Sequence, residues 1–496
     1  MARLLSKSKY LAGNQCPKLL WTQVNQPSSI PPVDTATQHV FDQGHLVGEY
    51  ARQLYPEGIQ IPQDDFMENI HETRRLLAER RPLFEAGILH GKIYSRVDIL
   101  DPVNDDEWDI IEIKVSTSVK DVHIDDVVFQ KHCCEQAGLK IGACKLGFVN
   151  REYVRSGIID PQELFVIEDI STRMEEAGRD IEERILALFD VILRGTSPDI
   201  PIGRHCLDPY ECPLRAKCWA FLPENSVFDL RGGKTNQFSL YEQGIMSIKD
   251  IPDDIVLSRQ QRIQRECLLT GKTHIEREEI RRFLDRLEHP LYYLDFETVS
   301  PAIPPYDGMR PYQDMPFQFS LHIVEEYGSE PVHHSFLAEG KEDPRPRILN
   351  ELQMLLGSEG SIVAYNAGFE ESVLKELVEA FPEHSDWLQG ILARMVDLLF
   401  PFTNFHYCHA SQKDTASLKK VLSALTGRGY EEMGIGNGMD ASIAYAKIAY
   451  GSATEEEIAR IRADLSAYCK LDTEGMIWIV EELRRLSGHA QSRRLL

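Results

Sequence analysis

The feature that most restricts how this chain folds is a pair of carboxylates within an apolar run at residues 290–298. The aromatic side chains before the pair, Tyr292 and Tyr293, are typical of a buried β-strand. Because side chains alternate along a strand, Asp295 and Glu297 point to the same face. Two neighbouring carboxylates resist burial unless a cation neutralises them. The pattern therefore predicts either a divalent-metal site or an edge strand whose acidic face lies in water.

Two later segments bear on this choice. Residues 361–370 predict an apolar strand, a turn and a helix that opens near Phe369 and carries Glu370. A later helical pattern carries Tyr468 and Asp472, which are four positions apart and share one helix face. Carboxylates are the ligands that Mg²⁺ and Mn²⁺ prefer, so these segments favour a metal site over a solvated edge.

This set resembles the DnaQ-like 3′–5′ exonucleases of the RNase H-like superfamily. These enzymes carry Asp-x-Glu on the first strand, then Asn-x-x-Phe-Asp, then a terminal Tyr-x-x-x-Asp. The resemblance implies that Asp295, Glu297 and Asp472 are metal ligands and that Tyr468 orients the attacking water. Glu370 stands where the family has Asp, and the extra methylene moves that carboxylate by about a bond length.

A second acidic constellation lies in a predicted hairpin at residues 91–115, where two strand-like runs flank a polar turn. If the hairpin is centred on Asp105, Asp98 lies directly opposite Glu112. Lys114 then shares the face of Glu112. Two carboxylates and an ammonium at one point predict a metal site with a cation that orients water or stabilises developing charge. The alternative is an ordinary surface strand.

This arrangement resembles the RecB-like branch of the PD-(D/E)XK nucleases, in which a strand Asp precedes Glu-x-Lys and a following helix supplies Gln. The resemblance implies two metal ligands, Asp98 and Glu112, within a set of four catalytic residues: Asp98, Glu112, Lys114 and Gln130. The branch also carries an upstream helical Gly-x-x-x-His, and here Gly48 occupies the His position. His45 or Glu49 can replace that ligand, and we prefer His45.

Four of the ten cysteines form a pattern. Cys206, Cys212 and Cys218 follow a C-x5-C-x5-C spacing, and Cys16 lies far upstream. Disulfides are disfavoured in a cytosolic chain, so metal binding is the better interpretation. A single N-terminal Cys and a C-terminal triplet around a RecB-like core resemble the iron–sulfur nucleases. The resemblance implies a [4Fe–4S] cluster on the four thiolates, and a zinc site with the same ligands is the alternative.

Composition limits the partners. The formal net charge of −24 argues against a surface coated in basic side chains for general nucleic-acid binding, although a nuclease needs only a local basic groove. The N-terminal residues lack the apolar run of a signal peptide, and the sequence contains no apolar stretch of about 18 residues. We therefore expect a cytoplasmic protein without a membrane partner.

At 496 residues the chain is too long for one core. We expect an α/β protein with a PD-(D/E)XK restriction-endonuclease-like domain at 1–222, a helical connector at 226–285, and an RNase H-like domain with a mixed central sheet at 286–485. Residues 165–195 predict a long amphipathic helical stretch. The layout resembles a bacterial family that joins an iron–sulfur RecB-like module to an RNase H-like exonuclease module.

This resemblance implies a metal-dependent nuclease with a 3′–5′ exonuclease site and a second, RecB-like site. We expect it to act on nucleic acid, DNA rather than RNA, in DNA repair, recombination or defence. Two alternatives stay open. One is a nucleic-acid-binding scaffold in which one or both sites are inactive, as Glu370 and Gly48 suggest. The other is an RNA-processing exonuclease.

Overall fold

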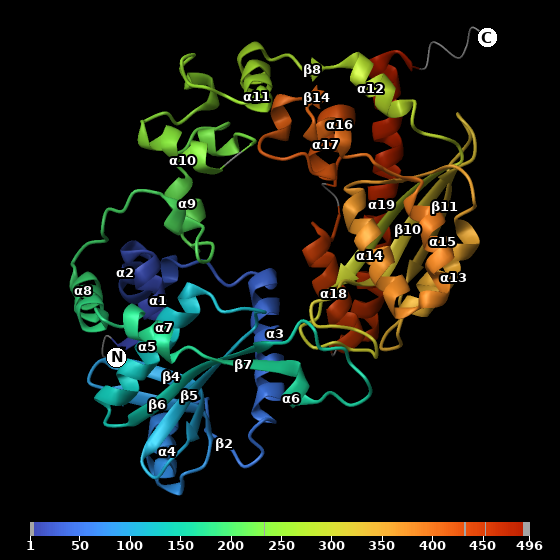
Figure 1. Ribbon diagram of the computed structural model, residues 1–496. Coiled ribbons are helices and arrows are strands. Elements are labelled where there is room, and N and C mark those ends of the chain that lie inside the picture. Colours follow the sequence, from blue (N-terminus) through green and yellow to red (C-terminus); the bar gives the residue numbers. More distant parts are fainter. Residues whose placement is uncertain (1–3, 233, 431–432, 452, 490–496) are drawn as a thin grey trace. The chain divides into compact units, whose positions relative to one another are not determined.

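Figure 1 shows the computed structural model, which describes residues 4–232, 234–430, 433–451 and 453–489. The chain is a mixed α/β protein that divides into two compact units. The first unit comprises residues 1–221 and 301–312, and the second comprises residues 222–300 and 313–496. The predicted connector at 226–285 lies within the second unit.

The first unit is built on a mixed sheet of seven strands. The strands are β1 (Leu5–Ser6), β2 (Ile59–Gln60), β3 (Leu83–His90), β4 (Ile93–Pro102), β5 (Glu107–Lys114), β6 (Lys140–Val149) and β7 (Phe165–Asp169). Their order is β2-β3-β4-β5-β6-β7, and β1 pairs in parallel with β4. The pairs β3–β4, β4–β5 and β6–β7 are antiparallel, whereas β5–β6 is parallel.

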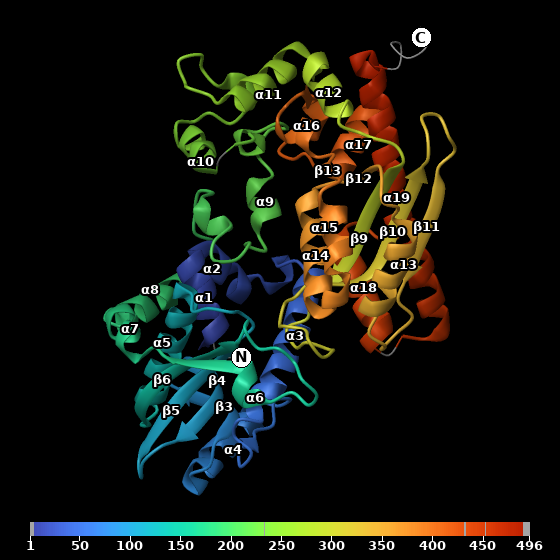
Figure 2. The same cartoon turned by 45° about the vertical axis from the view of Figure 1, so that its right-hand side comes forward.

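Helices of the first unit pack on and around this sheet (Figure 2). They are α1 (Lys7–Gln15), α2 (Pro17–Asn25), α3 (Thr35–Arg52), α4 (Phe66–Leu76), α5 (Asp121–Gln136), α6 (Pro161–Leu164), α7 (Ser171–Ala177), α8 (Ile181–Leu193) and α9 (Arg215–Trp219). Short 3₁₀ turns are η1 (Pro27–Ser29), η2 (Leu77–Glu79) and η3 (Arg204–Cys206). Helix α5 contacts β3, β4 and β6, and α1 contacts α5. Phe129 of α5 and Tyr10 of α1 are fully buried in the same core.

The β4–β5 hairpin has the predicted register. Ile99 pairs with Ile111 and Leu100 pairs with Ile110, so the next step of this ladder sets Asp98 opposite Glu112. By contrast, the prediction of helix throughout residues 165–195 is wrong at its start, because Phe165–Asp169 is strand β7. Its apolar residues fit a strand as well as a helix, and pairing with β6 decides between them.

The second unit has a five-stranded mixed sheet in the order β11-β10-β9-β12-β13. The strands are β9 (Leu291–Val299), β10 (Met315–Val324), β11 (Val332–Leu337), β12 (Ser361–Ala364) and β13 (Met395–Asp397). β9 is antiparallel to β10 and parallel to β12, which places it at the centre of the sheet. A separate small antiparallel pair joins β8 (His274–Ile275) to β14 (Tyr407–Cys408).

The helices of the second unit are α10 (Lys234–Glu242), α11 (Arg259–Thr270), α12 (Arg277–Leu284), α13 (Arg345–Leu355), α14 (Ala367–Ala380), α15 (Ser385–Leu392), α16 (Phe400–Thr403), α17 (Leu418–Thr426), α18 (Gly438–Tyr450) and α19 (Glu455–Ser487). Some of these helices pack against this sheet, such as α13, α14, α18 and α19, whereas α10 and α11 lie away from it (Figures 1 and 2). Short 3₁₀ turns are η4 (Val227–Asp229), η5 (Ile248–Asp250), η6 (Pro382–His384) and η7 (Ala410–Gln412). Across the described ranges, no helix combines the length and the apolar run needed to cross a membrane.

The long helix α19 carries much of this unit's core and lies against β9, β10 and α17. A capping box fixes its start, since Glu457 N donates to Thr454 Oγ1 at 3.3 Å and Thr454 N donates to Glu457 Oε2 at 3.0 Å. Gly488 ends it in the left-handed conformation, at φ 72°. The helix therefore presents a fixed buried face to the central strand.

Candidate functional site

The central strand β9 carries the first two acidic side chains. Its alternation places Asp295 and Glu297 on the same face, as the sequence predicts, and the antiparallel partners on β10 are Ser320 and Gln318. Glu297 is only 6 % exposed. The acidic face of this strand is thus turned into the protein, which excludes the alternative of a solvated edge strand.

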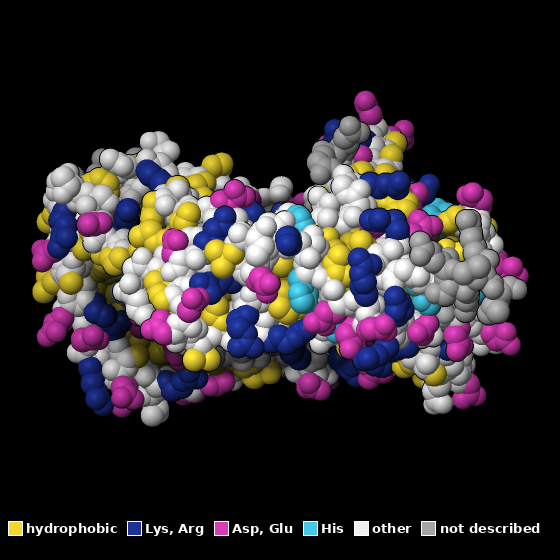
Figure 3. All heavy atoms as spheres, turned by 90° about the horizontal axis from the view of Figure 1, so that it is seen from above, with side chains coloured by type: hydrophobic (Ala, Val, Ile, Leu, Met, Phe, Trp, Pro, Cys, Tyr) yellow, Lys and Arg dark blue, Asp and Glu magenta, His cyan; other side chains and the backbone are white. Residues whose placement is uncertain are grey.

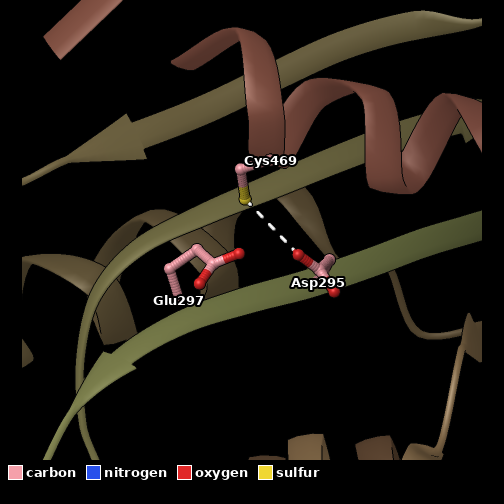
Figure 4. Close-up of side chains that lie close together, drawn as sticks. All are labelled: Asp295, Glu297 and Cys469. Atoms are coloured by element: carbon pink, nitrogen blue, oxygen red, sulfur yellow. Dashed lines mark hydrogen bonds between the residues drawn. The ribbon is translucent and has the colours of Figure 1, made fainter. Parts of the chain in front are cut away.

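Helix α19 brings Tyr468 and Asp472 over that face, and both are buried. A third residue of the helix, Cys469, was not predicted, and its Sγ donates to Asp295 Oδ2 at 3.5 Å (Figure 4). The ligand atoms of Asp295, Glu297 and Cys469 all lie within 4.8 Å of one another. The signal for Cys469 was present in the sequence, because a residue three positions before Asp472 shares its helix face.

Glu370 joins the cluster from the first turn of α14. The turn before it is held by Asn366, whose φ of 71° is left-handed, and Asn366 N donates to Asp397 Oδ1 at 2.9 Å. Leu399 N donates to the same oxygen at 2.9 Å, so Asp397 fixes the turn. Glu370 is 2 % exposed, and its buried Oε2 atom has no hydrogen-bond partner among the described residues. An unpartnered buried carboxylate oxygen is costly and suits a site that receives a cation.

The electrostatics of the four carboxylates follow from burial and mutual repulsion. Burial, with the charges of Asp472 and other carboxylates of the cluster, raises the pKa of both Asp295 and Glu297 well above its usual range. Burial raises the pKa of Asp472 to about 7, although hydrogen bonding from Tyr430 opposes the shift. Burial and the charge of Asp397 raise the pKa of Glu370 to about 8. The cluster therefore holds more negative charge than its own surroundings neutralise.

Two phenols and one ammonium surround Asp472. The Tyr430 hydroxyl donates to Asp472 Oδ1. Tyr468 lies beside Tyr430, with ring centroids 5.9 Å apart. Lys419 Nζ lies 4.9 Å from the centroid of each of these rings. Tyr430 was not among the predicted residues, and both Tyr430 and Lys419 come from segments about 40 to 50 positions before Asp472.

The acidic side chains of this site line a cavity of about 690 Å³. The cavity is lined by the predicted residues Asp295, Glu297, Glu370, Tyr468 and Asp472. Lys419 and Asn437 also line it. Its volume is within the range of small-molecule sites. All five residues that the sequence predicted for this site therefore meet at one cavity.

The first unit holds the second predicted constellation. Gln130 Nε2 of α5 donates to Glu112 Oε2 at 2.7 Å, and Lys114 Nζ donates to Glu112 Oε1 at 2.6 Å. Asp98 Oδ2 accepts from Ile113 N at 2.9 Å. The structure therefore brings together Asp98, Glu112, Lys114 and Gln130. A Cβ atom at Gly48 would lie 3.8 Å from Arg52 Nη2, in ordinary van der Waals contact.

Two further residues complete this constellation and were not predicted. Asp126 lies on α5 one turn before Gln130 and pairs with Lys114 at 2.5 Å. Lys7, the first residue of α1, pairs with Glu112 at 2.8 Å and with Asp126 at 3.8 Å. The helical spacing of Asp126 and Gln130 could have revealed the former, whereas nothing near Lys7 in the sequence points to it.

The pKa pattern differs from that of the second unit. Burial acts to raise the pKa of Glu112, but the ammonium groups of Lys114 and Lys7 outweigh it and leave that pKa below its usual range. Burial and the charge of Glu112 raise the pKa of Asp98 to about 7. Most of the negative charge here is thus paired within the protein.

The predicted ligand His45 is an exposed residue of α3. Among the residues that the structure describes, no ion pair or hydrogen bond links His45 to Asp98 or Glu112. The structure therefore does not bring it to the carboxylates, and the ligand role remains a prediction.

The four patterned cysteines meet. Cys16, Cys206, Cys212 and Cys218 line one small cavity, together with Lys18, His205 and Arg215. Cys16 is the C-cap of α1, and Cys212 N donates to Cys206 O at 2.9 Å. Burial raises the pKa of Cys212 to about 11, and the neighbouring thiols add to the shift. Bound cations favour thiolates, so this grouping has the donor set of a metal centre.

Comparisons with known proteins match one segment of the chain to a described family and assign no activity. Residues 292–417 match the family described as a domain of unknown function (DUF2779). The uncharacterized protein UU173 of Ureaplasma parvum serovar 3 (strain ATCC 700970) is 25 % identical over 236 residues, 42 % of this chain and 34 % of that protein. The chain thus spans about a third of the length of this relative.

A solved structure titled "Crystal structure of SSO0001" is also similar. It is 14 % identical and covers 45 % of this chain and 89 % of its own, with a TM-score of 0.23. A likeness of that size transfers neither fold nor activity. Function must therefore be inferred from the residues of the two sites.

Proposed function

We propose that the second unit hydrolyses phosphodiester bonds of nucleic acid with the help of divalent cations, and that it removes nucleotides in the 3′ to 5′ direction. The observation that carries this proposal is the convergence of four carboxylates at a cavity of about 690 Å³: Glu297, Glu370 and Asp472, which are buried, and Asp295, which is partly buried. Their raised pKa values mark a site with a deficit of positive charge. An RNase H-like fold for this unit belongs to the same proposal.

The donor set fits Mg²⁺ or Mn²⁺, because carboxylate oxygens dominate it and Glu370 Oε2 is buried without a partner among the described residues. Asp295, Glu297 and Asp472 would hold the metal, and Glu370 would complete its surroundings. The metal would supply Lewis-acid stabilisation of the phosphate and lower the pKa of an attacking water.

The chain's own residues would position the reactants. Lys419 Nζ lies in the same cavity as the carboxylates and would attract the substrate's phosphate. Tyr468, which lines the cavity one helical turn from Asp472, would orient the attacking water. On the face shown in Figure 3, Lys and Arg side chains are intermixed with Asp and Glu. A local cation such as Lys419 would therefore matter for substrate capture.

The first unit would provide a second metal-dependent nuclease site of the PD-(D/E)XK kind. Asp98 and Glu112 would bind the cation, Lys114 would orient water or stabilise developing charge, and Gln130 would hold Glu112. With both sites, we propose a cytoplasmic nuclease that acts on DNA rather than RNA in repair, recombination or defence.

The four cysteines would hold a [4Fe–4S] cluster, and a Zn²⁺ ion is the alternative. Cys16 is distant in sequence from Cys206, Cys212 and Cys218, so either group would fasten the start of the first unit to its end. Iron and sulfide content, together with the absorption of anaerobically purified protein, distinguishes the two. A colourless protein that contains zinc would replace the iron–sulfur assignment.

A cleavage assay tests the function. Anaerobically purified protein is incubated with end-labelled single- and double-stranded DNA and RNA in the presence of Mg²⁺ or Mn²⁺. Asp295→Ala is expected to remove 3′–5′ degradation, and Glu112→Ala is expected to remove the second activity. The exposed carboxylates Asp386 and Asp106 provide matched controls, as Asp386→Asn and Asp106→Asn. If the wild-type protein binds these substrates but cleaves none of them, it is a scaffold and the proposal is wrong.

A further inference from the structure

The carboxylate site of the first unit contains the ammonium group of Lys7, a residue close to the N-terminus. Lys7 Nζ donates to Glu112 Oε1 at 2.8 Å, although the two residues are 105 positions apart. The Lys7 side chain is 25 % exposed, whereas that of Glu112 is 2 % exposed. Lys7 therefore reaches a buried carboxylate from a position that still contacts solvent.

The backbone of Lys7 is held firmly. Leu5 of β1, the strand just before α1, is fully buried and pairs with Ile93 of β4. Ser6 is the N-cap of α1, and its Oγ accepts from Lys9 N at 3.4 Å. One turn further, the Tyr10 ring stacks on Phe129 of α5, with centroids 4.7 Å apart. These contacts fix the backbone around Lys7, so the fold itself places the Lys7 ammonium at the carboxylate site.

Lys7 donates to a carboxylate oxygen, Glu112 Oε1, that could otherwise serve as a metal ligand. Glu112 Oε1 is shared by Lys7 and Lys114, and Glu112 Oε2 is taken by Gln130. Lys7 Nζ also lies 3.8 Å from Asp126 Oδ1. Both acceptor positions of Glu112 Oε1 are thus taken by ammonium groups, so a divalent cation that binds Oε1 must displace one of them. Of the two ammonium groups, Lys114 has the second strong contact, at 2.5 Å to Asp126, so Lys7 is the one held less tightly.

We propose that Lys7 is a positioning residue that pairs with Glu112 in the metal-free site and must release it when a divalent cation binds. This inference rests on the proposed metal dependence of the first unit. In the proposed function, the Lys7 ammonium competes with the divalent cation for Glu112. This competition sets the cation concentration at which the site becomes active. The partly exposed side chain of Lys7 gives the ammonium a route outward into water.

The test measures Mn²⁺ binding directly, by electron paramagnetic resonance of free Mn²⁺, in full-length protein. All variants carry Asp295→Asn, so that the second unit contributes little binding. Removing the competitor with Lys7→Ala should tighten Mn²⁺ binding by about three- to tenfold. Lys7→Arg keeps a cation and should bind as the parent does. Lys9→Ala is the matched control, because Lys9 lies on the same helix and its Nζ donates to Leu4 O at 3.2 Å.

The readout separates competition from a structural role. A residue that only supports the fold would weaken Mn²⁺ binding when removed, and Lys7→Ala would then overturn the proposal. Unchanged affinity in Lys7→Ala would overturn it equally. Glu112→Gln must abolish the site's Mn²⁺ binding, since otherwise the ion binds elsewhere and the proposal fails. Because the assay needs no substrate, a protein that binds Mn²⁺ as expected but cleaves nothing would contradict the nuclease function alone.

Discussion

The two carboxylate clusters of this protein solve the same electrostatic problem in different ways. In the first unit, Glu112 is paired with Lys7 and Lys114, and its pKa lies below the usual range. In the second unit, no ion pair joins Asp295 or Glu297 to an ammonium group among the described side chains, and their pKa values are raised even though the charge of Lys419 opposes the shift at Glu297. Ion pairs within the protein thus offset the charge of Glu112 in the first site, whereas the burial of Asp295 and Glu297 in the second site is not offset in this way.

This difference shows that a buried acidic cluster can either stabilise or destabilise the folded state, depending on its neighbours. A paired carboxylate stabilises the folded state, and removing it leaves buried ammonium groups unpaired. An unpaired cluster destabilises the folded state until a ligand arrives, which is common at sites built for binding. The two units therefore offer an internal comparison within one chain.

The largest expected effect is on cleavage. Asp295→Asn should lower the 3′–5′ exonuclease rate by on the order of a thousandfold, because it removes a ligand at the centre of the cluster. Glu112→Gln should leave that rate within about twofold of the wild type if the two sites act independently. Rates on a 3′-labelled strand provide the measurement. Equal losses in both variants would mean that the sites do not work separately.

The same two substitutions should have opposite effects on stability. In EDTA, Glu112→Gln should destabilise the protein by about 2 kcal/mol, since an ammonium loses its charged partner. Asp295→Asn should stabilise it by about 1 kcal/mol, since repulsion among buried carboxylates falls. Urea unfolding followed by circular dichroism checks both signs. The comparison breaks if Asp295→Asn destabilises the protein as Glu112→Gln does.

The pH dependence should also distinguish the units. A carboxyl whose pKa is raised in the folded state binds more protons when folded, so its contribution to stability falls as pH rises from its unfolded value to its folded value. For Glu370 and Asp472 these folded values are about 8 and about 7. Without metal, the second unit should therefore lose stability between about pH 4 and pH 8.

In the first unit, Asp98 should contribute a loss of the same sign up to its folded pKa of about 7. The lowered pKa of Glu112 acts in the opposite way, and its stabilisation is complete above the unfolded value. Hydrogen exchange of the β9 and α19 amides at pH 5.5 and pH 8 should therefore change more than that of β5. Saturating Mg²⁺ should reduce the change in β9 and α19, and a pH response unaffected by Mg²⁺ would argue against a cation site there.

The smallest expected effects concern residues around Asp472. Tyr468→Phe should lower the exonuclease rate by about tenfold, because it removes a hydroxyl that orients water and leaves the metal ligands in place. Tyr430→Phe is the matched variant, since Tyr430 donates to Asp472 but does not line the cavity. Its effect should be smaller, within about threefold. Single-turnover rates at saturating Mn²⁺ provide the measurement, and the reverse order would assign the catalytic phenol to Tyr430.

Much of both sites could be predicted from sequence, because short-range periodicity places the residues. The period of two along a strand sets Asp295 beside Glu297, and hairpin register sets Asp98 opposite Glu112. Helical spacing puts Tyr468 and Asp472 on one face. These relations are properties of the local backbone and need no knowledge of the rest of the fold.

Only the tertiary structure decided what meets these side chains. Lys7 and Glu112 are 105 positions apart, and Lys419 and Tyr430 approach Asp472 from other segments of the second unit. Such approaches depend on which elements pack together, and no sequence period encodes them. Packing also decided the electrostatic outcome. The same acidic residue type is charged and paired in one unit and held with a raised pKa in the other, because neighbours and burial, rather than the residue itself, set its pKa.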